Sequence, residues 1–293
     1  MACARHVSHA PGMLSFSTSA SERVQYTVVF LAPREHDWSL SQLYESEVPP
    51  ERASQFRQRL GSALALQGIS TAYAPTVRHM SGVVLDAKEF TQQTSLPCGV
   101  RILRPTRPCD GLPLEQRKSF LMSQGGCLLL VLSGYGSLGP VCIVAHAGRD
   151  SLLDSRYIHA GQTTRSDFSI IHAMVRNARL RGLKPPQATL RIFGGIPWQA
   201  FPHARKDSKH GKKNQELLEY LDLHYDGSMV RIRDDGAECL CMSSLAYRQA
   251  ELAGIGTICT KWDLPYNGDF AYTSHQNPAL SGKTRNLVVV TRK

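Results

Sequence analysis

The chain has 293 residues, of which 42% are hydrophobic and 20% are charged, a balance typical of a folded globular protein and not of a disordered one. Lysine and arginine number 34 against 24 acidic residues, and the formal net charge of +10 favours an anionic partner. Glycines and a proline interrupt the most apolar stretch, 127–147, so a membrane-spanning helix is excluded.

The N-terminus and the cysteines indicate how the chain is organised. Residues 1–22 contain no acidic side chain before Glu22, and we expect them to form a flexible leader ahead of one domain over 23–293. The leader has a weak resemblance to an organelle-targeting peptide. The eight cysteines contain no CxxC pair and no compact disulfide framework, so we expect reduced thiols in a cytoplasmic protein.

Hydrophobic periodicity and glycine or proline stops predict the elements of the domain. In chain order we expect a strand over 24–31, a helix over 49–67, strands over 82–85, 120–132 and 140–145, a helix over 166–181, a strand over 188–193, a helix over 242–253, and strands over 255–259 and 286–291. Strands and helices mix without strict alternation and no internal repeat is visible. The predicted fold class is therefore α/β or mixed α+β, a single-domain mixed sheet flanked by helices.

A basic run over 203–213 contributes much of the excess charge. Such a run is typical of a solvated loop, and its alternative role is the attraction of phosphate or nucleic acid. The sequence has no zinc finger, no aromatic RNP motif and no helix-turn-helix signature, so we do not expect nucleic acid to be the partner.

Three reactive side chains border or lie in apolar strands, where polar groups are costly to bury. His79 precedes the strand 82–85, Cys127 lies in one apolar run, and His146 follows the next. If those two runs pair around the glycine-rich turn 133–139, Cys127 and His146 meet at the end opposite the turn.

These side chains allow three interpretations. One cysteine with two imidazoles is a three-ligand zinc set with an open fourth position. A cysteine beside one histidine is instead a nucleophile–base pair, in which the imidazole lowers the pKa of the thiol. The third interpretation is an inert buried cysteine beside a hydrogen-bonded histidine.

The segments around Cys127 and His146 also resemble a known family. QGGCLLL (124–130) and VAHAG (144–148) resemble the TADC segment and the HAGWRG strand end of the laccase-domain, or YfiH-type, family. Other segments agree with its motifs in order and spacing: 77–84, 109–112, 193–197, 254–260, 272–276 and 282–286. The chain departs from the pattern at Gly126, where the family has Asp, at Arg149–Asp150, which replaces Trp-Arg-Gly, and at Gln276, where Arg is common.

The resemblance implies a function, because members of this family are described as zinc-containing purine nucleoside phosphorylases with adenosine deaminase side activity. It implies zinc ligands at His79, Cys127 and His146, and catalytic roles for Cys127, His146 and Asp110. Basic residues suit the binding of phosphate, and our candidates are Arg149, Lys283 and Arg285. The expected partners are a purine nucleoside and phosphate, with no membrane.

Alternatives remain open at this point. Copper is compatible with the ligand set, but the 11 histidines include no His-x-His pair, so a multicopper site is not expected. The fold class also resembles the catalytic domain of cytotoxic necrotizing factor toxins, which favours a metal-free Cys–His hydrolase or glutamine deamidase using Cys127 and His146. A non-catalytic protein that binds a partner through the basic run is the third alternative.

Overall fold

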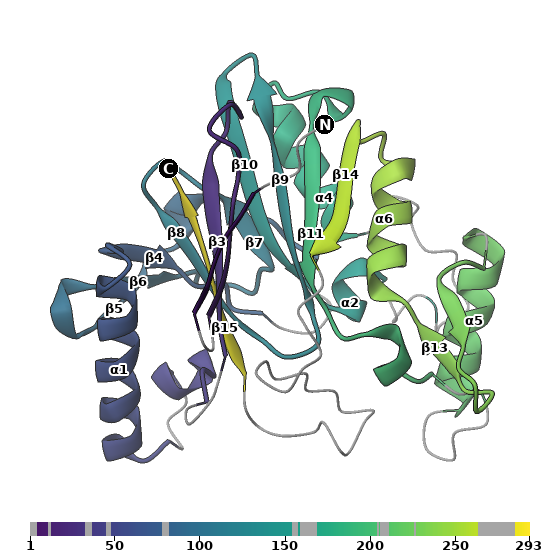
Figure 1. Cartoon of the computed structure of the whole chain (residues 1–293), viewed down its shortest axis with the longest axis horizontal. Helices are drawn as coiled ribbons and strands as arrows, with labels where there is room; N and C mark the ends of the chain where they lie inside the picture. The colour runs from purple at the N-terminus through teal and green to yellow at the C-terminus, as the bar shows by residue number, and fades with distance from the viewer. Residues whose placement is uncertain are drawn as a thin grey trace.

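Two β-sheets pack face to face, with helices on their outer surfaces (Figure 1). The computed structural model describes residues 5–10, 13–32, 37–44, 48–77, 82–153, 158, 169–203, 205, 211–225, 227–262 and 285–293. Within these residues the strands form an eight-stranded, a five-stranded and a two-stranded sheet. No helix among them has the length and apolar character needed to cross a membrane.

The eight-stranded sheet combines the two ends of the chain with its first half. Its strands, in spatial order, are β1 (Arg5–Ala10), β2 (Met13–Ser17), β3 (Tyr26–Leu31), β15 (Asn286–Arg292), β8 (Ser119–Gln124), β4 (Thr71–Tyr73), β6 (Arg101–Arg104) and β5 (Gln92–Ser95). Pairing is antiparallel except where β4 runs parallel to β6 and β8. The C-terminal strand β15 therefore lies in the middle of the sheet, between β3 and β8.

The five-stranded sheet is built around a long hairpin. Its spatial order is β14 (Thr257–Trp262), β11 (Thr189–Gly194), β9 (Leu128–Gly136), β10 (Gly139–Ala147) and β7 (Gly111–Pro113). The two-stranded sheet is β12 (Val230–Ile232) with β13 (Glu238–Leu240). In the hairpin, β9 and β10 pair in continuous register from Gly136↔Gly139 to Leu128↔Ala147.

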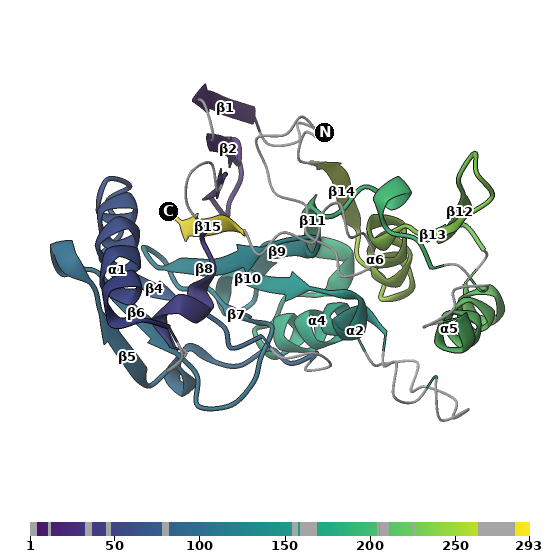
Figure 2. The ribbon, with the colours of Figure 1, turned by 90° about the horizontal axis from the view of Figure 1, so that it is seen from below.

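Helices cover the outer faces of both main sheets. The helices are α1 (Pro50–Ala65), α2 (Arg149–Leu152), α4 (Ile170–Leu180), α5 (Gly211–His224) and α6 (Met242–Leu252). Short 3-10 helices are η1 (Leu40–Leu43), η2 (Ala87–Glu89), η3 (Pro97–Gly99), η4 (Pro185–Gln187) and η5 (Trp198–Ala200). Figure 2 shows α4 and α2 against the β9–β10 side of the five-stranded sheet, near the middle of the molecule, with α1 at one end and α5 at the other.

Strand alternation divides the apolar side chains into three layers. The face of the eight-stranded sheet that meets α1 includes Leu121 and Val289, packed against Phe56 and Leu60 of the helix. The core between the two sheets includes Phe120, Met122, Val288 and Val290 from one side, and Leu129, Val131, Cys142 and Val144 from the other. The third layer lies between the five-stranded sheet and α2, α4 and α6.

The structure confirms the mixed α+β class and many of the expected elements. The predicted strands 24–31, 140–145, 188–193, 255–259 and 286–291 correspond to β3, β10, β11, β14 and β15, and the three predicted helices to α1, α4 and α6. The predicted helical stripe of α1 is confirmed at Phe56, Leu60 and Leu64, which are fully buried.

Three expectations differ from the structure. The run 120–132 is not one strand: it divides at Gly125–Gly126 into β8 and β9, which belong to different sheets. The segment 82–85 forms only an isolated parallel bridge, Val84↔Gly111, because the chain turns into η2 directly after it. Part of the expected leader 1–22 belongs to the fold, since β2 pairs with β3 and buries Leu14 and Phe16 between the sheets.

A buried ion pair connects the two sheets at one end of the core between them. Arg191 of β11 is 4% exposed and donates to the Tyr26 hydroxyl of β3 at 3.0 Å. Its other terminal nitrogen donates to Glu22 at 2.6 Å. Arg191 is the shared donor of this network, so removing it leaves the buried Tyr26 hydroxyl and the partly buried Glu22 carboxylate without that partner.

We therefore expect Arg191→Met to destabilise the protein by about 3 kcal/mol, because Glu22 and the Tyr26 hydroxyl lose their shared donor. Tyr26→Phe removes one hydrogen bond and should cost about 1 kcal/mol. The measurement is the free energy of unfolding from urea denaturation. The exposed helix residue Arg179 provides the matched control Arg179→Met, and a similar loss in that variant would contradict the prediction.

Candidate active site

Polar side chains replace apolar ones at the other end of the core between the sheets. Continued alternation along β15, β8 and β10 places Asn286, Gln124 and His146 on the same inward faces as the core residues of those strands. Asn286 and Gln124 are fully buried and are direct cross-strand partners, and His146 is also buried. The buried end of the core therefore holds groups that need hydrogen-bond partners.

Cys127 and His146 meet at this end, as the pairing of the two apolar runs predicted. Cys127 directly precedes β9, and His146 lies next to the end of β10, opposite Leu129. The Cys127 thiol and the His146 imidazole form a side-chain hydrogen bond. Gly148 leaves room for the pair, since a Cβ there would lie 3.2 Å from Cε1 of His146 and 3.6 Å from the sulfur.

Asp110 holds His146 from the side away from the cysteine. Its Oδ1 lies 3.1 Å from Nδ1 of His146, and its backbone carbonyl accepts from the His146 amide at 2.9 Å. The carboxylate is 1% exposed and directly precedes β7, which pairs with β10. With Nδ1 directed to Asp110, Nε2 is the ring nitrogen available to the sulfur.

Cys127 and His146 shift each other's pKa values. Burial by itself raises the pKa of the Cys127 thiol, but the charge of His146 and their hydrogen bond outweigh burial and lower the pKa below its ordinary value, with Arg285 contributing. Burial lowers the pKa of His146, but Cys127 and Asp110 outweigh it and raise the pKa. The arrangement thus favours a thiolate beside an imidazolium.

Gln124 was not among the predicted site residues, yet it supports the cysteine directly. Its Nε2 donates to the Cys127 carbonyl at 2.7 Å, while its buried Oε1 has no partner in the described part of the chain. Gly194 makes this possible, because it adopts φ +67° and a Cβ there would lie 2.4 Å from Nε2. The only sequence signal was the position of Gln124 three residues before Cys127.

The predicted phosphate-binding residues have different surroundings. Arg285 directly precedes β15, its charge acts on Cys127, and its amide donates to Asp37 at 2.9 Å. Arg149 opens α2, where its Nε donates to Asp150 at 3.1 Å. Lys283 lies outside the described residues.

The fit of the site to a metal ion depends on its donor atoms. Two of the three predicted ligands, Cys127 and His146, converge, and the Asp110 contact to Nδ1 is typical of a histidine that ligates metal through its other nitrogen. The third, His79, lies outside the described residues. Among the residues that the structure describes, no group of three or more metal-binding side chains occurs.

His203 differs from the solvated character expected of the run 203–213. It is fully buried; its Nδ1 donates to the Phe201 carbonyl at 3.1 Å, and its Nε2 accepts from Arg149 at 3.3 Å. Burial, and then the charge of Arg149, lower its pKa from 6.5 to about 4. The basic run therefore begins with a neutral histidine inside the fold.

We expect His203 to make the protein sensitive to acid. The unfolded chain takes up the proton near pH 6.5, but the folded protein only near pH 4, so stability falls as the pH decreases between these values, by about 3 kcal/mol in total. His203→Gln should flatten the dependence of unfolding free energy on pH over this window. The variant of the exposed His224, His224→Gln, should keep the wild-type slope, and equal slopes in all three proteins would contradict the prediction.

Comparisons with known proteins identify this fold. No protein-family model matches the sequence, and no curated protein matches it. Among solved structures, the Neisseria meningitidis protein NMB0706, of the family-model DUF152, is 14% identical, with a TM-score of 0.58 over 96% of this chain and 99% of that one. YlmD from Geobacillus stearothermophilus is also 14% identical, with a TM-score of 0.61 over 98% of both chains.

The third comparison agrees with the first two. The Bacillus licheniformis hypothetical protein YfiH is 14% identical and has a TM-score of 0.57 over 97% of each chain. The resemblance to toxin catalytic domains stays a prediction. Because all three structures match over nearly their whole length, the protein has the YfiH-type fold that its motifs predicted.

Proposed function

We propose that the protein is a zinc-dependent enzyme that cleaves purine nucleosides with phosphate, at a site formed by His79, Cys127 and His146. The observation that carries the proposal is the convergence of the Cys127 thiol and the His146 imidazole, with Asp110 holding the far nitrogen of the ring. The YfiH-type fold supports it, because the motif resemblance to that family implies this activity.

The roles of the protein residues follow from the contacts at the site. Zinc, when bound, supplies a Lewis acid and an activated water. Cys127 and His146 are two of its proposed ligands, and His79 is the third that the resemblance implies. Asp110 keeps Nε2 of His146 directed to the cysteine, and Gln124 holds the Cys127 backbone.

The reaction determines which other groups are needed. In phosphorolysis, the bond from C1′ of the ribose to the purine breaks, a phosphate oxygen bonds to C1′, and the departing purine takes up a proton. Arg285 is the described basic candidate whose charge reaches Cys127, so we assign it to the phosphate. Arg149 is engaged by Asp150 and His203, which makes it the second candidate, and Lys283 is the third. Deamination of adenosine is the side activity that the resemblance implies.

The same geometry favours a second candidate function, a metal-free hydrolase or deamidase. Asp110, His146 and Cys127 form a continuous chain from carboxylate to imidazole to thiol, which is the order found in cysteine-dependent hydrolases. In that case Cys127 attacks a carbonyl carbon directly. The two functions differ in whether the sulfur binds metal.

For the zinc enzyme we expect about one zinc per chain. Free base should form from adenosine or inosine only when phosphate is present. Cys127→Ala should lose both the metal and the activity, and Asp110→Asn should weaken zinc binding by about 10- to 100-fold, because His146 loses its orienting partner. Elemental analysis and chromatography of the base provide the measurements.

The exposed Cys98 provides the matched control, since Cys98→Ala should retain zinc and activity. Two results would overturn the phosphorylase proposal. One is base release at the same rate without phosphate, and the other is full zinc content in Cys127→Ala.

Alkylation distinguishes the two candidate functions. If zinc is bound, iodoacetamide should modify Cys127 slowly, and a chelator should accelerate the reaction because it frees the thiolate. If the site is metal-free, Cys127 should react rapidly with or without chelator. Peptide mass spectrometry measures modification of Cys127 against that of the exposed Cys98.

A further inference from the structure

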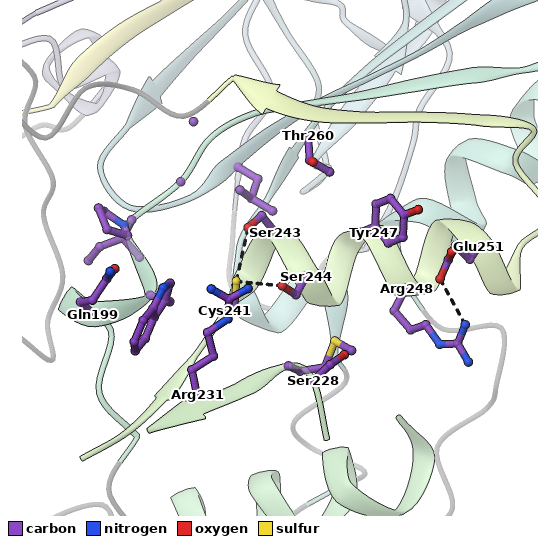
Figure 3. A pocket seen from close by; sticks show the side chains of 17 residues that line it. Gln199, Ser228, Arg231, Cys241, Ser243, Ser244, Tyr247, Arg248, Glu251 and Thr260 are labelled. Carbon is purple, nitrogen blue, oxygen red and sulfur yellow. Dashed lines mark hydrogen bonds and ion pairs between the residues drawn. The ribbon is translucent and has the colours of Figure 1, made fainter. Parts of the chain in front are cut away.

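A cavity of about 750 Å³ lies beside α6 (Figure 3). It adjoins the candidate active site, because Leu128, which follows Cys127, and Gly194, which lies against Gln124, are among its lining residues. Residues 194–199, β12 and α6 contribute its walls. Cys127, His146 and Asp110 are not among the described residues that line it. Its volume is in the range of sites that bind small molecules and cofactors.

Aromatic and cationic side chains meet on one wall of this cavity. The guanidinium of Arg231, on β12, lies over the ring of Trp198 with its carbon 5.5 Å from the ring centroid. Tyr247, on α6, lines the cavity as well and is 39% exposed (Figure 3). Tyr247 is exposed, whereas Trp198 is half-buried and has Arg231 over one face; a planar heterocycle stacks on an accessible face of such rings.

The positive charge of the cavity is not fully neutralised by its own carboxylate. Glu251 pairs with Arg248 at 3.1 Å, whereas Arg231 forms no ion pair with a carboxylate in the described part of the chain. The guanidinium of Arg231 is therefore available to an anionic ligand beside the Trp198 ring.

The first turn of α6 adds hydrogen-bond donors on the same side. The helix begins at Met242 with no acidic residue in its first turn and no side chain capping its amides. Ser243 and Ser244 line the cavity, and their hydroxyls lie 3.4 and 3.0 Å from the Cys241 sulfur. The amides at the start of a helix favour a phosphate, and here they supplement Arg231, whereas the Ser244 hydroxyl already donates to Cys241.

We propose that this cavity binds a mononucleotide, with its planar base against the aromatic wall and its phosphate held by Arg231 and the first turn of α6. An uncharged heterocycle would not pair with the Arg231 guanidinium, and inorganic phosphate would not stack on the Trp198 ring. The ligand that satisfies both features combines a heterocycle with a phosphate. This cavity adjoins the site assigned above to catalysis at Leu128 and Gly194, but Cys127, His146 and Asp110 are not among the described residues that line it.

The test is calorimetric titration of the full-length protein with AMP, adenosine and inorganic phosphate. At this cavity AMP should bind at least about tenfold more tightly than adenosine or phosphate, because only AMP contacts both the Trp198 ring and the Arg231 guanidinium. Arg231→Ala should weaken AMP binding about tenfold and leave adenosine binding within twofold. Trp198→Ala should weaken both by about fivefold or more.

The matched control is Arg57→Ala, which removes the same charge from the exposed face of α1 at the other end of the molecule and should change neither affinity. Arg231 is itself exposed, so its variant should retain the wild-type melting temperature. AMP affinity that is unchanged in Arg231→Ala or in Trp198→Ala would overturn the proposal. Any adenosine or phosphate binding that neither variant changes belongs to the proposed catalytic site. Repeating the titration in Cys127→Ala separates this result from the proposed catalysis, because binding at α6 should persist without the cysteine.

Discussion

The register of the β9–β10 hairpin is the constraint on which the candidate active site depends. Its continuous pairing aligns His146 with Leu129, which places the imidazole on the inward face and beside Cys127. Because side chains alternate between the faces of a strand, a shift of one residue would move His146 into the layer occupied by α2, α4 and α6. The apolar residues on both faces of the hairpin make such a shift costly, so packing of the core also fixes the position of the reactive pair.

Polar groups occupy both ends of the core between the sheets. One end stabilises the fold, and the other holds the reactive pair. At one end Arg191 donates to Tyr26 and to Glu22 and connects the sheets, while its Nε has no partner among the described residues. At the other end Cys127 and His146 shift each other's pKa, and Gln124 keeps an oxygen without a partner among the described residues. The Arg191 contacts are suited to stability because the buried charge is paired, whereas a cysteine and a histidine with shifted pKa values are suited to a ligand or to chemistry.

Part of the site could be predicted because it depends on local pairing. Two apolar runs around a glycine-rich turn favour a hairpin, and that alone brings Cys127 near His146. Gln124 and Asn286 could not be found in this way, because they meet only when β15, at the end of the chain, pairs with β8. The burial of His203 likewise depends on its contacts with Arg149 and the Phe201 carbonyl, which a basic composition does not reveal.

The sequence by itself determined the mixed class, the amphipathic helices α1, α4 and α6, and the strands whose apolar pattern is strong, since periodicity and stop signals act over a few residues. Tertiary structure alone decided that β8 and β9 separate into different sheets at Gly125–Gly126, and that β2 joins the eight-stranded sheet. It also decided which polar residues share the buried end of the core. The physical reason is that these outcomes come from pairing between distant segments, whose stability depends on the whole core and not on local preference.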